Sequence, residues 1–447
     1  MKKITKEILQ RIEGEATLEL EWKNNKIDYA KIKFLNFRGI EKILEKRPFL
    51  DALAITPRVC GICNTSHIVA AINAIEDAYI SIGVDLKLSK KAKHIREFAL
   101  NAEKIQNHIK WLYFSILPEI YKINGDDEAS IKAFEGKEWI KAQKICSEML
   151  KAMAIFTGQW PHGSFCMVGG VTCDPTQGDI YEAMRYLDNV TEYCEKEIFG
   201  LPIDEFIEFD SAMQIMATEG SLKKTVEVIV NNRLNHIGKS YDRFISFGNN
   251  SSKKKSKKCE VTRILNADVN FVSESLKNSF FEENGYTYSK SAMYKNRYLE
   301  TGPIARMMIV KNPLIRDLHR KSKDSILTRI VARVAEIAHL LKKSKKLLTQ
   351  MNLSELSCIS PNIPYNNINA SGIGRCEAAR GSLIHKIDIK KGLIESYDII
   401  TPTVWNLGNG SKDEPAVAQK AIMGLSSISE ADFVFKSFDV CAVCTTQ

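Results

Sequence analysis

Two C-x-x-C pairs are the residues in this sequence whose types and spacing most clearly could do chemistry. Cys60 and Cys63 form the first pair, and Cys441 and Cys444 form the second, close to the final residue, Gln447. A C-x-x-C turn lets two thiolates converge on one soft metal ion. Two such pairs could therefore build a site with four sulfur ligands.

The residues alone leave three interpretations of these pairs open. A zinc site is the first, although zinc sites usually place their pairs roughly 15 to 20 residues apart, and position 441 is 378 residues beyond position 63. A catalytic transition-metal centre is the second. The third is that the pairs share no site, since a chain with 11 cysteines can contain such spacing by accident.

Length and composition limit the class of protein. The 447 residues are 44% hydrophobic and 26% charged, which indicates a folded chain with one large core or a few smaller ones. The 63 Lys and Arg against 54 Asp and Glu give +9, too mild an excess to indicate a nucleic-acid partner. No window reaches the roughly 18 to 20 apolar residues of a membrane helix, so we expect no transmembrane segment.

The chain also carries hints of its compartment. Its amino terminus has no apolar stretch or cleavage site of a secretory signal. The odd number of unevenly spaced cysteines fits a reducing environment rather than a disulfide framework. We expect a cytoplasmic protein, with any membrane association made through partners.

Hydrophobic periodicity predicts the elements that must position the cysteines. Alternation over 17–22 and 27–34, around Asn24-Asn25, predicts a β-hairpin. Longer periods predict helices at 66–83, 89–117, 128–157, 176–197 and 324–350. The stretches 358–376 and 398–415 have the Pro, Gly and Asn content of ordered loops. The basic run 248–258 predicts a solvated surface insertion; the alternative is a surface that contacts an acidic partner.

These elements predict an α+β protein with a predominantly helical core bundle and a small N-terminal β-sheet. We expect a single domain over 1–447. Its parts would be a hairpin region over about 1–36, a helical core over about 37–350, and a loop-rich metal-binding segment over about 351–447.

Further motifs extend the pattern over essentially the whole chain, in a constant order. They are Arg11-Ile12-Glu13-Gly14, Phe37-Arg38-Gly39-Ile40-Glu41, Trp160-Pro161-His162 with Gly169-Gly170-Val171-Thr172, Glu300-Thr301-Gly302-Pro303-Ile304-Ala305-Arg306, Glu377-Ala378-Ala379-Arg380-Gly381-Ser382-Leu383-Ile384-His385, and Pro402-Thr403-Val404-Trp405-Asn406. With the two cysteine pairs, this series resembles the large, catalytic subunit of nickel–iron hydrogenases. The resemblance implies that family's fold, with some likeness to its cytoplasmic uptake and hydrogen-sensing group.

The resemblance implies a nickel–iron centre whose iron carries carbon monoxide and two cyanides. Cys60, Cys63, Cys441 and Cys444 would all bind nickel, and Cys63 and Cys444 would also bridge to iron. Cys441 would accept a proton and Glu13 would take it onward. Hydrogen is a very weak acid, so its cleavage needs both a metal and a base.

Residues around the metals follow from the same resemblance. Four thiolates and two cyanides leave a negative buried site, so Arg380 would lie beside the metals and donate to one cyanide, with Thr403 facing the other. Glu41, the backbone carbonyl of Ile399 and Gln447 would hold magnesium or a similar hard cation.

Three histidines could lie around the metals. His67, His162 and His385 match hydrogen-bonding positions of the family, although each alone is more typical of an ordinary core histidine.

The sequence departs from the family at its end and in one helix. Gln447 stands where the mature family usually ends in histidine, and Trp111 replaces the second histidine of a helix motif. The chain stops where the family's precursors are cleaved, which fits either a mature form or a member made without a tail.

The function implied is the cleavage or formation of hydrogen, H2 ⇌ 2 H+ + 2 e−. Because the remaining cysteines lack ligand spacing, electrons would leave through a separate small subunit with iron–sulfur clusters, and maturation proteins would install the metals. Two alternatives are a regulatory hydrogen-sensing subunit that signals to a partner, and a related subunit of a quinone-reacting complex that lacks nickel.

Overall fold

A computed structural model of the chain describes residues 3–248, 268–361 and 367–445. The basic run predicted at 248–258 lies, apart from Gly248, outside these residues. The described part is dominated by helices with small antiparallel sheets, which confirms the predicted fold class.

The N-terminal sheet has three antiparallel strands in the order β1 (Lys3–Ile8), β2 (Thr17–Lys23) and β3 (Lys26–Lys33). The predicted hairpin is confirmed as β2 and β3. Asn24 and Asn25 have φ of 51° and 59°, the left-handed pair that a two-residue hairpin turn requires and that Asn tolerates. Strand β1 lies within the predicted N-terminal hairpin region of about 1–36, although no bounds were predicted for it.

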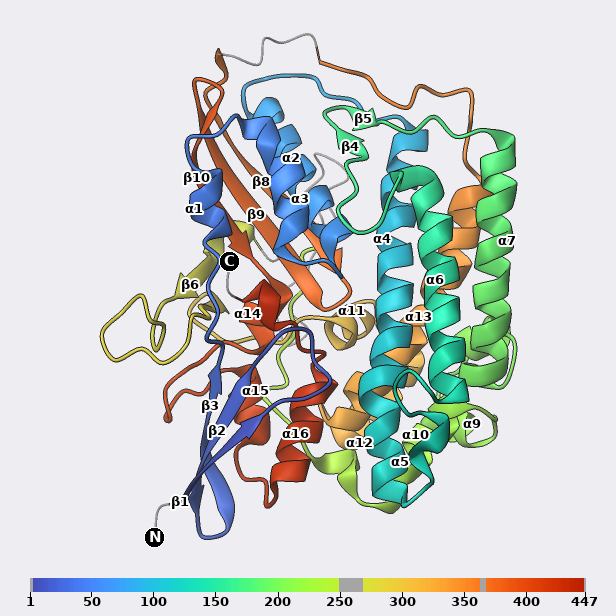
Figure 1. Cartoon of the computed structure of the whole chain (residues 1–447), viewed down its shortest axis with the longest axis vertical. Coiled ribbons are helices and arrows are strands. Elements are labelled where there is room, and N and C mark those ends of the chain that lie inside the picture. Colours follow the sequence, from blue (N-terminus) through green and yellow to red (C-terminus); the bar gives the residue numbers. More distant parts are fainter. Residues whose placement is uncertain (1–2, 249–267, 362–366, 446–447) are drawn as a thin grey trace.

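Long helices form where the apolar period indicated them. They are α3 (Asn64–Ser81), α4 (Lys90–Trp111), α6 (Lys137–Thr157), α7 (Gln177–Tyr193) and α13 (Ile326–Thr349). Helices α4, α6, α7 and α13 run side by side as a bundle (Figure 1). Two of these helices have side-chain caps at their starts: in α4, Ser89 Oγ accepts from Ala92 N at 3.0 Å, and in α7, Thr176 forms a capping box with Asp179.

Two helix boundaries differ from the prediction. The helix predicted over 89–117 continues through a π-helical turn (Leu112–Ile116) into α5 (Leu117–Asn124). The helix predicted over 128–157 begins only at Lys137. Gly136, the residue before this helix, lies close to the backbone of Ser130: an added Cβ at Gly136 would lie 2.2 Å from Ser130 O.

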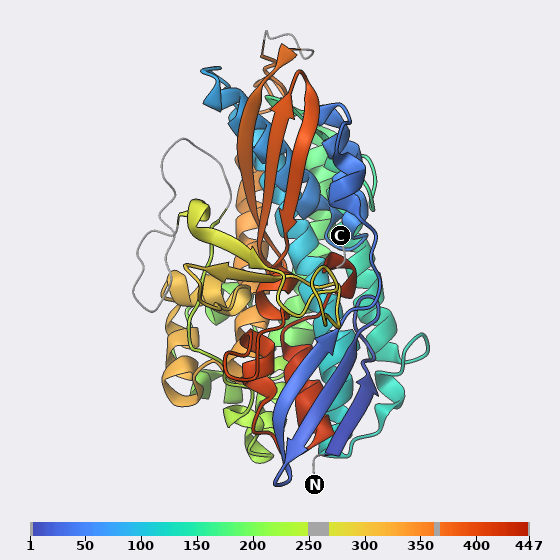
Figure 2. The same ribbon diagram turned by 90° about the vertical axis from the view of Figure 1, so that its left-hand side faces the viewer.

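A second three-stranded sheet corrects the prediction of ordered loops at 358–376 and 398–415. Its antiparallel order is β10 (Leu393–Ile400), β9 (Gly381–Lys390) and β8 (Ala370–Ala378). Both predicted loops are therefore partly strand. In Figure 2 this sheet lies above the N-terminal sheet.

Helix α3 lies directly against β8 because that strand has glycines facing it. A Cβ on Gly374 would lie 1.9 Å from Ala70 O, and one on Gly372 would lie 2.1 Å from Ala74 O. Small residues on both elements let the backbones approach closely. This contact fixes the helix that follows the first cysteine pair.

The remaining elements are short. The helices are α1 (Ile40–Leu44), α2 (Ala52–Ile55), α8 (Ile203–Ile207), α9 (Ala212–Met216), α10 (Ser221–Asn231), α11 (Pro303–Ile309), α12 (Pro313–Ser322), α14 (Pro402–Asn406), α15 (Val417–Ile422) and α16 (Ile428–Ser437), and the strands are β4 (Cys166–Met167), β5 (Gly170–Val171), β6 (Val272–Ser275) and β7 (Ser291–Tyr294). The 3-10 helices η2 (Thr56–Val59) and η9 (Ala442–Cys444) carry or flank the cysteine pairs.

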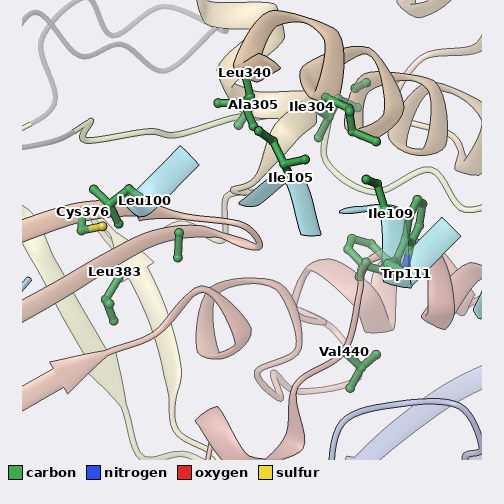
Figure 3. Packing of buried hydrophobic residues seen from close by; sticks show 14 of the residues in the cluster. Leu100, Ile105, Ile109, Trp111, Ile304, Ala305, Leu340, Cys376, Leu383 and Val440 are labelled. Carbon is green, nitrogen blue, oxygen red and sulfur yellow. The ribbon is translucent and has the colours of Figure 1, made fainter. Parts of the chain in front are cut away.

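One extensive hydrophobic core joins the bundle to the second sheet. Figure 3 shows Ile105 and Ile109 of α4 near Ile304 of α11, with Cys376 of β8 and Leu383 of β9 in the same cluster. All five side chains are almost fully buried. In the described ranges, no helix is both long and apolar enough to cross a membrane.

Candidate metal centre

The four cysteines of the two C-x-x-C pairs meet in one buried cluster. The Sγ atoms of Cys60 and Cys441 lie 3.5 Å apart, as do those of Cys63 and Cys444, and the Sγ atoms of Cys441 and Cys444 lie 3.0 Å apart. Each residue is at most 6% exposed. The end of the chain therefore returns to position 60, as the sequence predicted.

The first pair is positioned by the start of α3. Cys60 is extended after η2, and Cys63 caps the helix that begins at the next residue. The buried carboxylate of Glu103 accepts from the amides of Thr65 (2.6 Å) and Ser66 (3.1 Å). It thus satisfies amides that the first helical turn leaves unpaired, and holds the turn next to Cys63 in place.

The second pair is positioned by the N-terminal segment. Glu13 and Cys441 form a parallel β-bridge, in which Ala442 N donates to Glu13 O at 2.7 Å and Glu13 N donates to Val440 O at 3.3 Å. Gly14 has φ of +81°, and a Cβ there would lie 3.1 Å from Ala442 Cβ. The glycine is needed both for its conformation and for this close approach.

Two further side chains tie the segments together. Arg38 donates to the carbonyl oxygens of Val59 and Val443, which neighbour a cysteine of each pair. Thr401 Oγ1 donates to Cys444 O at 2.7 Å. The cysteines are thus held by hydrogen bonds from four separate parts of the chain.

Positive charge lies beside the sulfurs. Arg380, 7% exposed, donates through Nε to Asp439 O and pairs through Nη2 with Asp439 Oδ1, both at 3.0 Å. Arg333 pairs with the other oxygen of Asp439 at 2.8 Å. Burial disfavours the charged form of Arg380, but Asp439 and the sulfurs of Cys441, Cys63 and Cys60 outweigh it and raise its pKa well above its usual value. Arg380 therefore stays a cation.

The sulfurs share protons unequally. The pKa of Cys60 lies well below its usual value because the Cys441, Cys444 and Cys63 thiols hydrogen-bond to its sulfur. The pKa values of Cys63 and Cys444 are raised, first by their contact with Cys441. A bound metal ion would take the place of the remaining protons, since metals bind the thiolate form.

The donor set fits the predicted nickel–iron centre. Besides the four converging sulfurs, Arg380 Nη1 and Thr403 Oγ1 are buried and have no hydrogen-bond partner in the described part of the chain. Helix α14, which carries Thr403, packs against η9, which carries Cys444. Buried donors are normally satisfied, so these two are the groups that iron-bound cyanides would satisfy.

Glu13 lies between the cluster and a cavity. It is half-buried, and burial raises its pKa; the charge of Cys60 adds to this effect, whereas Arg380 and Lys110 oppose it. It lines a cavity of about 360 Å³ whose walls also include Ile62, Arg380 and Asp439. The raised pKa makes the Glu13 carboxyl hold a proton more readily than an exposed glutamate does.

At the expected hard-cation site, the Glu41 carboxylate contacts nitrogen donors of the protein. Glu41 Oε2 accepts from Lys290 Nζ at 2.9 Å, and Glu41 Oε1 accepts from Ile399 N at 2.8 Å and from Lys290 Nζ at 3.2 Å. Both carboxylate oxygens thus contact nitrogen donors. Gln447 lies outside the described residues. The described residues, as arranged, do not fit a divalent cation.

The three predicted histidines have different surroundings. A ring nitrogen of His67 lies within 4.8 Å of the sulfurs of Cys63 and Cys444, and His67 Nδ1 contacts His385 Nε2 at 3.1 Å. Burial lowers the pKa of His67 to about 4, and that of His385 well below its usual value. His162 Nδ1 instead contacts Pro57 O at 3.1 Å, one turn before the cysteines.

Several residues that build the site were not predicted from the sequence: Arg38, Glu103, Arg333, Asp439, and Tyr397, which contacts His385. Arg38 lies within one of the motifs above, and Asp439 stands two residues before Cys441, so both carried a usable signal. The others are ordinary helix or strand residues, and only the fold brings them to the cluster.

The chain resembles known hydrogenases along its length. A family model described as nickel-dependent hydrogenase matches residues 38–117 and 245–447, together more than half of the chain. The chain is 27% identical to the periplasmic NiFeSe hydrogenase large subunit of Desulfomicrobium baculatum, over 90% of this chain and 85% of that protein. It is 23% identical to the NAD-reducing hydrogenase HoxS subunit beta of Cupriavidus necator, over 100% and 95%.

Solved structures share the fold. The Ni-Fe-Se hydrogenase of D. vulgaris Hildenborough in its reduced state superposes with a TM-score of 0.84 at 20% identity, covering 100% of both chains. The H2-activated NiFeSe hydrogenase of Dm. baculatum gives 0.82 at 24% identity, again over 100% of both chains.

Proposed function

Because the chain belongs to the nickel-dependent hydrogenase family, we propose that it is the catalytic large subunit of a hydrogenase that interconverts H2 with protons and electrons. The observation that carries the proposal is the meeting of four cysteine sulfurs from opposite ends of the sequence. Their convergence also argues against the alternative of a relative without nickel.

Cys60, Cys63, Cys441 and Cys444 would hold nickel, with Cys63 and Cys444 shared with iron. When bound, such a centre supplies the hydride acceptor that protein side chains lack. Arg380 and Thr403 would orient the diatomic ligands of the iron through their two unpartnered donors. Burial of all four cysteines excludes water, which strengthens each of these electrostatic contacts.

Proton handling falls to the N-terminal segment. Cys441 would accept the proton, and the Glu13–Cys441 bridge keeps the Glu13 backbone beside it. The Glu13 carboxyl, with its raised pKa, would receive that proton and release it into the adjoining cavity. Arg380 would hold the charge of the site close to neutral as the proton leaves.

Electrons need an acceptor outside this chain. The cysteine clusters in the described ranges that could hold a metal involve only the two C-x-x-C pairs and His67, and Cys259 lies outside those ranges. We therefore propose an iron–sulfur small subunit as the partner, with the carbon monoxide and cyanides installed by maturation proteins.

Two further proposals concern a hard cation and the location of the protein in the cell. A hard cation near Glu41 would require Lys290 to move, so the magnesium content of the purified protein decides it. A cytoplasmic location is supported by the ten cysteines of the described ranges, which are all unpaired, although one relative is named as periplasmic. Fractionation of cells tests the location.

The test of the proposed function is hydrogen-dependent reduction of a dye by the purified complex, expressed with maturation proteins. Cys441→Ser and Cys444→Ser should abolish it. Cys146→Ser, a change at a buried cysteine outside the cluster, serves as the control and should retain activity. Wild-type complex that contains nickel and iron but neither consumes nor evolves hydrogen would refute the proposal.

A further inference from the structure

A buried hydrogen-bond chain runs from the cysteine cluster into the second sheet. His67 Nδ1 contacts His385 Nε2 at 3.1 Å, and His385 Nδ1 contacts Tyr397 Oη at 2.8 Å. The three side chains come from α3, β9 and β10 and are at most 3% exposed. In each of these two contacts, one atom carries the proton and donates it, and the other accepts it.

The tyrosine end of the chain fixes its direction. In the described part of the protein, the hydrogen bond to His385 Nδ1 is the one recorded for Tyr397 Oη. A buried hydroxyl proton needs an acceptor, so Tyr397 donates and His385 Nδ1 accepts. The His385 proton is then on Nε2, and it is donated to His67 Nδ1. The proton of His67 is therefore on Nε2.

The opposite direction leaves unsatisfied groups at both ends. If His67 Nδ1 donated to His385, the Tyr397 hydroxyl proton would have no acceptor. One ring nitrogen of His67 lies within 4.8 Å of the sulfurs of Cys63 and Cys444, and since Nδ1 contacts His385, Nε2 is the nitrogen free to face them. A neutral His67 protonated on Nδ1 would turn an unprotonated Nε2 toward these sulfurs, so that acceptors would face each other once the sulfurs are thiolates. With metal bound, Cys63 and Cys444 are thiolates, and only a proton on His67 Nε2 suits them.

We propose that Tyr397 is a positioning residue that, through His385, keeps the N–H of His67 directed at the sulfurs of Cys63 and Cys444. This rests on the proposed function, in which those two sulfurs bridge nickel and iron. A hydrogen bond withdraws electron density from a thiolate, so the chain would tune the iron from a residue that touches neither metal.

Infrared spectra of the metal-loaded complex test the proposal without relying on activity. In Tyr397→Phe the fixed proton order is lost, the N–H of His67 is no longer held toward the sulfurs, and the iron becomes more electron-rich. The iron-bound carbonyl band should shift to lower wavenumber while the nickel and iron contents stay unchanged. Tyr29→Phe is the matched control, since this buried tyrosine donates to Gly410 O at 2.6 Å in another part of the fold, and its band should not move.

A second variant separates proton order from mere packing. A glutamine amide at position 385 would be a permanent donor to His67 Nδ1, so Tyr397→Phe combined with His385→Gln should restore the wild-type band. If Tyr397→Phe does not load metal, His385→Gln alone decides: a wild-type band supports the chain, and a displaced band contradicts it.

Two results would overturn the inference: a loaded Tyr397→Phe complex with an unmoved band, or a shifted band that the double variant fails to restore. A wild-type complex with no carbonyl or cyanide bands would instead count against the proposed nickel–iron centre. The two failures are thus distinguishable.

Discussion

Gly374 is the position where a single added methyl group should disturb the metal centre through packing alone. It lies on β8, and its Cβ would meet Ala70 O at 1.9 Å and Ala74 N at 2.4 Å. Both atoms belong to the backbone of α3, so no side chain can rotate away. Gly374→Ala must therefore push α3, which begins beside Cys63, away from the sheet.

Overpacking of this kind costs about 1–3 kcal/mol, and more where backbone must move. For a chain of this length, each 1 kcal/mol lowers the unfolding temperature by roughly 1 °C. We expect Gly374→Ala to unfold about 3 °C below wild type, and to contain less nickel per chain because Cys63 and His67 shift relative to the second cysteine pair.

The assay is thermal unfolding of the purified complex together with elemental analysis. Gly178→Ala is the control: it lies in the first turn of α7, and its Cβ would meet nothing closer than Thr176 Oγ1 at 3.6 Å. That change should leave stability equal or slightly higher. A Gly374→Ala complex as stable and as fully loaded as Gly178→Ala would refute the packing argument.

Three further predictions concern the site. Glu13→Gln should lower hydrogen uptake by roughly 10²–10⁴-fold, because a general acid–base group is lost, with nickel retained; equal activity would exclude the proton role. Arg38→Ala removes the donor shared by Val59 and Val443, so nickel content should fall, whereas a matched change at exposed Arg185 should leave it intact. Burial raises the pKa of Glu103 to about 7, so the native state binds an extra proton between about pH 4.5 and 7. Wild-type stability to denaturant should therefore fall as pH rises through that window, by roughly 3 kcal/mol at most, and a Glu103→Gln variant with the same slope would contradict this.

The elements predicted correctly from the sequence are those whose signal is local. The alternation around Asn24-Asn25 specified the hairpin, and long stretches of helical period specified α3 and α13. Strand β8 was missed because Gly372 and Gly374 are typical of a loop. Those glycines are present for contact with α3, which is a tertiary reason that no local pattern expresses.

In the site too, residues with a local sequence signal could be predicted, whereas residues placed by tertiary contacts could not. Cys60 and Cys441 could be assigned from their spacing and surrounding motifs, although they are 381 positions apart. Arg333 and Tyr397 could not, because their partners, Asp439 and His385, become neighbours only in the folded chain. Glu41 was predicted as a cation ligand, but its pairing with Lys290 depends on a residue 249 positions away.

Anomalous diffraction from crystals of the mature complex, measured at the nickel and iron absorption edges, shows whether the four cysteines hold a nickel–iron centre. We expect one nickel and one iron between the sulfurs of Cys60, Cys63, Cys441 and Cys444, with iron on the side of Cys63 and Cys444. A lone zinc at the four sulfurs, or nickel and iron bound elsewhere in the complex, would contradict it.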